Sequence, residues 1–239
     1  WFTYFKRFMK KIKLFADGLK LDEIDQDFGI EIDGYTFNPS IFKNHGVKDY
    51  LNYCKIILDK CSNKPISFEV FADDEKNMIK QANILKSLGE NVYIKVPITF
   101  TNGEYTTKVL DQLVNTNTKL NVTAIFTKEQ VQKIIPILKD TNSILSVFAG
   151  RIFDCGLDAF KIMEDISLDV KKNSSCETLW ASPRMPYDYI AAINSGTDII
   201  TMQGAQIKKL SLFGKNPKDY SLETVKQFFN DAKASGFKI

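Results

Sequence analysis

Eight short β-rich segments alternate with longer amphipathic segments along almost the whole chain, and this alternation limits the folds open to it. It predicts one α/β domain with a parallel sheet. With 239 residues, the chain has the length of a compact (β/α)8 barrel, about 250 residues. We therefore expect a single (β/α)8 TIM barrel over residues 11–239. The expected strands cover residues 11–17, 33–38, 66–72, 91–97, 120–126, 144–150, 178–182 and 198–202.

A doubly wound open sheet is the alternative to the barrel. Neither GxGxxG nor GxxxxGK followed by Ser or Thr occurs after the early strands, so the commonest functional signature of that alternative is missing. Thr127, and either Asp73 or Asp74, are expected to cap helices. Clear helical patterns cover residues 47–61, 74–89 and 128–140, and an extra C-terminal helix is expected at 221–235.

The composition excludes several classes of function. Lys and Arg number 32 and Asp and Glu number 29, a balance too even to indicate a nucleic-acid or membrane partner. His45 is the only histidine, which argues against a His-based triad or a multi-His metal site. The four cysteines lack metal-site spacing, so reduced thiols in a cytoplasmic protein are expected.

The first residues form a segment unlike the rest of the chain. "WFTYFKRF" is aromatic and basic, and Met9 follows it in "MKKIKLFADG", which is typical of a natural start. We interpret residues 1–10 as an N-terminal extension that lies at or upstream of that start. A short interfacial anchor is the alternative, but so few residues bury little area.

Lys95 lies within the apolar stretch "NVYIKVPITF" at 91–100, whose alternation is typical of a strand. An isolated ammonium is costly to bury. Other polar residues also lie near the ends of the expected strands, where barrel enzymes carry their chemistry. They are Asp17, Thr36, Asn38, Glu69, Asn121, Thr123, Ser146, Arg151, Ser182, Arg184 and Thr201.

A desolvated lysine can act as a nucleophile. It loses its proton more readily and attacks a carbonyl to form a Schiff base, an electron sink for making or breaking the adjacent carbon–carbon bond without a metal. Lys95 is therefore predicted to be a covalent nucleophile. Carboxylates must then move the protons, and Asp17 and Glu69 are the candidates. Glu69 and Thr123 could hold a water molecule between them.

Two of the three arginines, Arg151 and Arg184, follow late strands. Barrels often bind phosphate after strands 7 and 8, and guanidinium groups suit a phosphate dianion. Ser182 could add a hydroxyl. The alternative is two ordinary surface arginines.

Seven motifs, in this order, resemble the transaldolase family, particularly its short members related to fructose-6-phosphate aldolase. The resemblance runs from about residue 12 to the C-terminus. The motifs are "FADGLKLDEI" (15–24), "GYTFNPS" (34–40), "ISFEVFADD" (66–74), "VYIKVP" (92–97), "LNVTAIF" (120–126), "SVFAGRIFD" (146–154) and "WASPR" (180–184).

The resemblance implies a Schiff-base mechanism without metal or organic cofactor. It implies that Lys95 is the nucleophile, Asp17 the proton-transfer carboxylate, and Glu69 with Thr123 the holders of the catalytic water. It assigns Asn38, Asn121 and Ser146 to substrate hydroxyls, and Arg151, Ser182 and Arg184 to phosphate. Thr36 and Phe148 are expected to line the same pocket. The substrates would be phosphorylated ketoses and aldoses.

Two positions distinguish the activities of the family. Aldolase-type members tend to carry glutamine at the position of Glu69 and tyrosine at that of Phe148, whereas this chain has the transaldolase-type pair. Transfer of a dihydroxyacetone unit is therefore the leading hypothesis. A fructose-6-phosphate-type aldolase that releases dihydroxyacetone is the alternative, and a non-catalytic sugar-phosphate-binding barrel is a third.

The chain also departs from the family. It has "DGL" in place of "DTA", Phe37 in place of a threonine, and no proline in its eighth strand, which leaves the sugar substrate open. Short members form rings of five or ten chains, in which the C-terminal helix reaches a neighbour. The expected C-terminal helix carries an apolar stripe that would suit such a homo-oligomer, although packing on its own barrel is the alternative. The stripe consists of Val225, Phe228, Phe229 and Ala232.

Overall fold

Eight parallel strands close into a barrel in a computed structural model that describes residues 12–61 and 63–239. Each strand pairs with the next along the chain, and β1 also pairs with β8, which confirms the (β/α)8 barrel and excludes the open sheet. The predicted extension at residues 1–10 lies outside the described residues. The strands are β1 Lys13–Asp17, β2 Gly34–Thr36, β3 Ile66–Glu69, β4 Val92–Pro97, β5 Leu120–Ile125, β6 Ile144–Val147, β7 Glu177–Trp180 and β8 Ile199–Met202.

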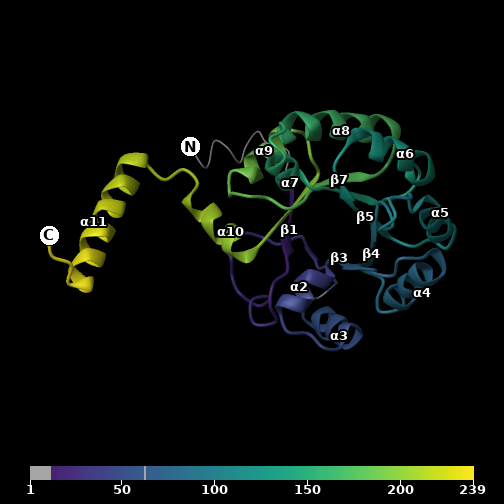
Figure 1. Cartoon of the computed structure of the whole chain (residues 1–239), viewed down its shortest axis with the longest axis horizontal. Helices are drawn as coiled ribbons and strands as arrows, with labels where there is room; N and C mark the ends of the chain where they lie inside the picture. The colour runs from purple at the N-terminus through teal and green to yellow at the C-terminus, as the bar shows by residue number, and fades with distance from the viewer. Residues whose placement is uncertain (1–11, 62) are drawn as a thin grey trace.

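Helices surround the barrel as an outer ring (Figure 1). The predicted caps Thr127 and Asp74 are confirmed, because each side chain accepts a hydrogen bond from a backbone N–H of the first turn, at Gln130 and Asn77. The helices are α2 Pro39–Asn44, α3 Tyr50–Lys60, α4 Glu75–Lys86, α5 Thr107–Asn115, α6 Lys128–Leu138, α7 Ala149–Asp154, α8 Ala159–Asn173, α9 Asp188–Asn194, α10 Gly204–Lys209, the 3-10 turn η1 Leu210–Leu212 and α11 Pro217–Ser235.

The apolar core has two parts, because successive side chains of a strand point to opposite faces. The larger part packs the outer face of the strands against the helices. The smaller part fills the barrel interior around Phe15, and a Cβ on Gly34 would lie 2.7 Å from the Phe15 ring, so glycine is required opposite it. Nearer the amino-terminal end of the strands, Lys13 and Glu177 form an ion pair, with Nζ 2.7 Å from Oε1. The interior residues are Phe15, Ile144, Leu179, Ala181 and Ile199, with Tyr93 and Phe148 packed against them.

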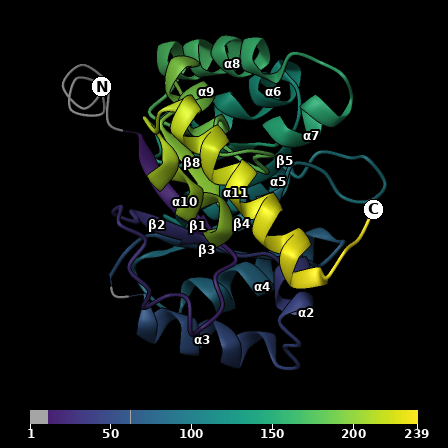
Figure 2. The same cartoon turned by 90° about the vertical axis from the view of Figure 1, so that its left-hand side faces the viewer.

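The C-terminal helix α11 stands apart from the barrel (Figure 1), and in the view turned by 90° it lies in front of it (Figure 2). It begins at Pro217, earlier than the predicted Ser221, because Asn216 caps it by accepting a hydrogen bond from Lys218 N. None of its residues is buried. None of the described helices is long and apolar enough to span a membrane.

Candidate active site

Lys95 lies near the centre of the barrel, on β4. Its register partners are Glu69 on β3 and Asn121 on β5, so the three side chains share the inner face. The residue is 5% exposed, and its Nζ lies 3.3 Å from Glu69 Oε2. The ammonium is therefore buried and paired with a carboxylate, as a charge in such a place must be.

Glu69 ends β3 at the mouth of the barrel. Desolvation raises the pKa of its carboxyl above the ordinary value, and the Asp17 carboxylate adds to this rise. Lys95 opposes the shift through its charge and a hydrogen bond, and Arg151 opposes it more weakly. The hydroxyl of Tyr50 donates to the backbone carbonyl of Glu69 at 2.8 Å and so fixes the end of the strand. Glu69 is thus a carboxyl with a raised proton affinity beside an amine.

Asp17 ends β1 on the same inner face. Desolvation raises the pKa of its carboxyl, while the charge of Lys95 and the hydrogen bond from Thr36 act against that rise. Thr36 Oγ1 lies 2.6 Å from Asp17 Oδ1 and also 2.6 Å from Thr201 Oγ1. The hydroxyl of Thr36, a predicted pocket residue, therefore forms hydrogen bonds to Asp17 and Thr201 within the protein. Two carboxylates, Asp17 and Glu69, thus share one ammonium.

Thr123 lies two residues after Asn121 on β5, so its buried hydroxyl is on the same face of the strand. The residue is 1% exposed, and its Oγ1 has no hydrogen-bond partner within the described part of the chain. Directly after it, Ala124 has φ of 60° and the pairing of β5 with β6 shifts, which marks a β-bulge. A left-handed alanine is strained by about 1 kcal/mol or more. Bulges of this kind occur next to active sites, where they aim a side chain.

Asn121 is held by two serines. Ser146 Oγ donates to Asn121 Oδ1 at 2.6 Å, and Asn121 Nδ2 donates to Ser67 Oγ at 3.0 Å. All three residues are buried, so this network fixes the orientation of the amide. The sequence analysis missed Ser67. Its position two residues before Glu69 in "ISFE" places it on the inner face and could have identified it.

Asn38 lies just beyond β2 and caps α2, because its Oδ1 accepts a hydrogen bond from Ile41 N at 2.9 Å. The cap uses the carbonyl oxygen and leaves the amide nitrogen as the group that could contact a ligand. Phe37, which occupies the position of a family threonine, points to the outer core instead and packs against Phe42 and Phe68. This departure therefore lies outside the barrel interior.

The two predicted phosphate arginines lie on adjacent connections. Arg151, in α7, places its guanidinium carbon 5.1 Å from the centroid of the Phe148 ring. Arg184 follows β7 and forms a fork with Asp154, with Nε 3.1 Å from Oδ1 and Nη2 on Oδ2. Arg184 is thus already paired with a carboxylate, which the sequence analysis did not predict.

Two backbone features bring these connections together. A Cβ on Gly150 would lie 1.6 Å from the carbonyl oxygen of Ser182, so only glycine fits there. Ser182 itself has φ of 59°, the left-handed region that favours glycine. The buried carboxylate of Asp188 accepts hydrogen bonds from the backbone N–H groups of Arg184 and Met185 and so fixes the turn between them.

Phe148 extends the wall of the same site. It packs against the interior cluster of the barrel and stacks on Phe126, with ring centroids 5.9 Å apart. The predicted residues thus form two groups. Lys95, Asp17, Glu69 and Thr123 line the inner face of the strands. Gly150 and Ser182 join the connections that carry Arg151 and Arg184.

Comparisons with known proteins identify relatives of this chain. The family model described as transaldolase/fructose-6-phosphate aldolase matches residues 14–239. A protein of Ruegeria sp. (strain TM1040) with the name "Probable transaldolase" is 33% identical over 232 residues, covering 95% of this chain and 100% of that protein. A protein of Clostridium kluyveri (strain ATCC 8527) with the same name is 36% identical over 194 residues, covering 80% of this chain and 86% of that protein.

Solved structures show the same fold at low sequence identity. The carboxyl transferase domain of Rhizobium etli pyruvate carboxylase matches with a TM-score of 0.56 and 10% identity, covering 84% of this chain and 41% of that one. A mandelate oxidase variant matches with a TM-score of 0.53 and 13% identity, covering 85% of this chain and 67% of that one. At these identities the likeness concerns the barrel alone.

Proposed function

Since this chain belongs to the transaldolase/fructose-6-phosphate aldolase family, we propose that it transfers a dihydroxyacetone unit between sugar phosphates through a Schiff base on Lys95. One observation carries the proposal. The buried amine of Lys95 lies 3.3 Å from Glu69 Oε2, and the Asp17 carboxyl shares the same interior.

The first step joins the ketose to the lysine. Glu69, whose pKa is raised by desolvation, takes a proton from the Lys95 ammonium, and the free amine attacks the C2 carbonyl to give a carbinolamine. Loss of the carbinolamine hydroxyl as water, with a proton returned by Glu69, leaves an iminium ion. The Thr123 hydroxyl has no hydrogen-bond partner among residues 12–61 and 63–239, which supports a role in holding that water.

The second step breaks the carbon–carbon bond. Asp17 removes the proton of the C4 hydroxyl, the C3–C4 bond breaks, and its electron pair passes to the iminium nitrogen, forming an enamine. The first aldehyde leaves. The enamine then attacks an acceptor aldehyde, Asp17 returns its proton to the new oxygen, and hydrolysis frees the product and Lys95. The raised pKa of Asp17 suits a group that is both base and acid in one cycle.

The residue at position 148 supports transfer rather than release. Phe148 has no hydroxyl with which to protonate the enamine, and it packs against the barrel interior. The fructose-6-phosphate-type aldolase uses the same lysine and remains the second candidate. A non-catalytic binding barrel is less well supported, because binding alone does not need a buried lysine.

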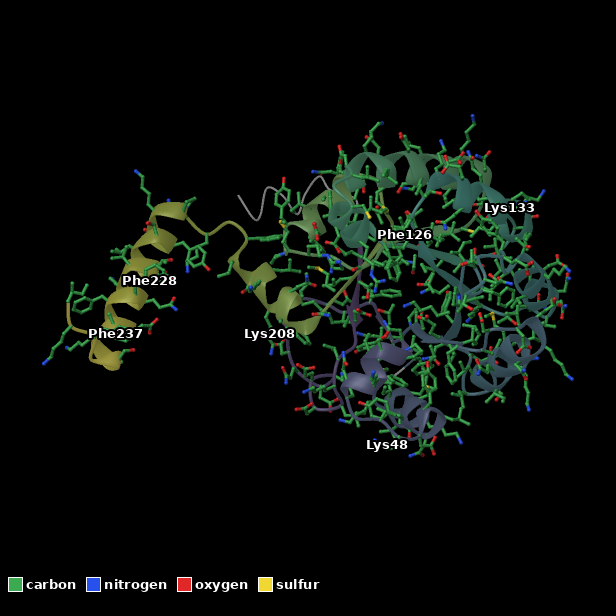
Figure 3. The ribbon with its side chains drawn as sticks, viewed as in Figure 1. Lys48, Phe126, Lys133, Lys208, Phe228 and Phe237 are labelled. Carbon is green, nitrogen blue, oxygen red and sulfur yellow. The ribbon has the colours of Figure 1, made fainter. Side chains whose placement is uncertain are left out.

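The apolar stripe of α11 supports a homo-oligomer of the same chain. Val225, Phe228 and Phe229 are each at least 60% exposed, and Phe228 lies on the separate helix while Phe237 lies on the segment that follows it (Figure 3). Burying one such side chain is worth about 1.5–3 kcal/mol. A ring of chains, in which α11 packs on a neighbour, removes this face from water.

Borohydride trapping tests the proposed function. Incubation with fructose 6-phosphate and borohydride should reduce the iminium to a stable secondary amine, and peptide mass spectrometry should locate it on Lys95. Lys95→Met should abolish both the adduct and turnover. Lys133→Met removes an exposed lysine on the outer ring of helices (Figure 3) and should change neither. An adduct elsewhere, or turnover by Lys95→Met, would contradict the Schiff-base mechanism.

A further inference from the structure

A chain of three oxygens crosses the inner face of β8, β2 and β1. Thr201 Oγ1 lies 2.6 Å from Thr36 Oγ1, which lies 2.6 Å from Asp17 Oδ1. Thr36 is 1% exposed and Thr201 is 4% exposed. Because β1 pairs with both β2 and β8, closure of the barrel brings the two threonines together, although 165 positions separate them.

The number of protons fixes the direction of these hydrogen bonds. An ionised carboxylate can only accept, so Thr36 must donate its single hydroxyl proton to Asp17. The contact between the two threonines then needs a proton from Thr201, with Thr36 as acceptor. When Asp17 is ionised, the donors therefore run from Thr201 to Thr36 to Asp17.

The same two hydroxyls can serve the protonated acid. Asp17 then donates to Thr36, and Thr36 turns its own proton toward Thr201. Backbone or amide N–H groups could not do this, because they donate only and would favour the ionised form alone. A hydroxyl pair keeps the carboxyl hydrogen-bonded in both states.

We propose that Thr201 is a positioning residue for Asp17, and that it acts through Thr36 as the end of a reversible hydroxyl chain. The inference rests on the proposed function, in which Asp17 takes a proton from one substrate hydroxyl and returns it to another oxygen in every cycle. Both protonation states of the acid must then be accommodated without rearrangement of the barrel. Thr201 makes this possible through Thr36 and forms no side-chain hydrogen bond to Lys95 within the described part of the chain.

Other charged groups also act on this carboxyl, and a test must hold them constant. Desolvation raises the pKa of Asp17, and the charge of Lys95 on β4 acts against that rise. The charges of Lys95, Asp17 and Arg151 also act on the pKa of Glu69 on β3. Arg151 comes from α7. None of them contacts Thr201 through a hydrogen bond among the described residues, so a change at Thr201 leaves these charges in place.

The experiment compares Thr201→Val, which keeps the shape but removes the hydroxyl, with Thr201→Ser, which keeps the hydroxyl. The readout is the pH dependence of kcat/KM for transfer. Loss of Thr201 weakens the hydrogen bonding of Asp17 in both protonation states. The ionised form loses more, because hydrogen bonds to a charged group are the stronger ones, so the acid limb should move up by about 0.2–0.6 pH unit. Thr201→Ser should return it to the wild-type position. The small residual activity of Asp17→Asn should lack this acid limb. Adding Thr201→Val to that variant should therefore not shift its pH profile.

A matched control separates positioning from stability. Thr178 is a buried threonine on β7 whose hydroxyl bonds Asp198 instead, so Thr178→Val should lower the melting temperature without moving the acid limb. If Thr201→Val does not fold, Thr201→Cys, a poor donor, takes its place. A Thr201→Val profile that superimposes on the wild type would overturn the inference while Lys95 trapping still succeeds. Failure of wild-type trapping would overturn the proposed function and the inference with it.

Discussion

Gly150 and Ser182 meet backbone to backbone, so closely that a Cβ on Gly150 would lie 1.6 Å from the Ser182 carbonyl oxygen. This contact joins the connection that carries Arg151 to the one that carries Arg184. The spacing of the two guanidinium groups therefore depends on the absence of a side chain at one position.

Gly150→Ala should separate the two arginines and reduce the preference for phosphorylated substrates. We expect the ratio of kcat/KM for phosphorylated over unphosphorylated substrate to fall about tenfold, equivalent to the loss of one charge-assisted contact. Gly89→Ala is the control, because a Cβ there meets the Asn91 side chain and the edge of Val92 rather than backbone. An unchanged ratio in folded Gly150→Ala would show that the contact does not set the phosphate site.

Arg151→Ala and Arg184→Ala should each raise KM for phosphorylated substrates, because each removes a contact worth about 1.5–3 kcal/mol of binding free energy. The effect on unphosphorylated analogues should be much smaller. Steady-state kinetics on both substrate classes measures this. Arg184→Lys keeps the charge but loses the fork to Asp154, so it should recover only part of the loss. Equal effects on both substrate classes would assign the arginines to structure.

Asp17→Asn should reduce transfer to a small residual rate but raise the free energy of unfolding near pH 8. The folded-state pKa of Asp17 is raised by desolvation, so the unfolded chain releases this proton first as pH rises. Wild-type stability therefore falls through the window between the unfolded value near 4 and the raised folded value, and the variant escapes that loss.

Urea denaturation at pH 8 and pH 3.5 checks the sign. The difference between Asp17→Asn and wild type should be present at pH 8 and largely gone at pH 3.5, where the carboxyl is protonated in both states. Asp140→Asn, at an exposed carboxyl after α6, is the control and should show no such pattern. A variant less stable than wild type at pH 8 would contradict the prediction.

Phe148→Tyr should shift the balance from transfer toward release of free dihydroxyacetone, because a phenol beside the adduct can protonate the enamine. With wild type, cleavage of fructose 6-phosphate alone should be slow, and erythrose 4-phosphate or another acceptor from a panel should accelerate it strongly. Phe126→Tyr adds the same hydroxyl to the ring stacked on Phe148 and should change the ratio less. Rapid release by wild type without acceptor would favour the aldolase.

The solution mass should be a multiple of 27.3 kDa, five or ten chains, as measured by light scattering at micromolar concentration. Replacing both Phe228 and Phe229 by Asp should lower it, because charges would occupy the exposed apolar face of α11. Lys226→Asp, on the same exposed helix, should leave the mass unchanged. A single-chain mass for the wild type would refute the ring.

The alternation of strands and helices was enough to predict the barrel, because strand period and cap residues such as Thr127 are local signals. Lys95 could be identified as well, since a lone ammonium in an apolar strand requires an explanation. The contacts that shape the site were not predictable in this way. Thr201 meets Thr36, and Arg184 meets Asp154, only after the barrel closes and its connections pack. The sequence predicted the helix α11 and its apolar stripe, but not that this helix stands apart from the barrel.

The apolar cluster around Phe15 closes the barrel interior toward the amino-terminal ends of the strands. Phe15, Leu179 and Ile199 fill the barrel beneath Lys95, and the Lys13–Glu177 pair lies below them. In the proposed mechanism, substrates would reach and leave the lysine at the other end of the barrel, where the strands end and α7 carries Arg151. In the proposed transfer, the departing aldehyde and the incoming aldehyde would use this same end of the barrel. The first must vacate it before the second can enter, so the order of the two half-reactions would be imposed by the shape of the protein.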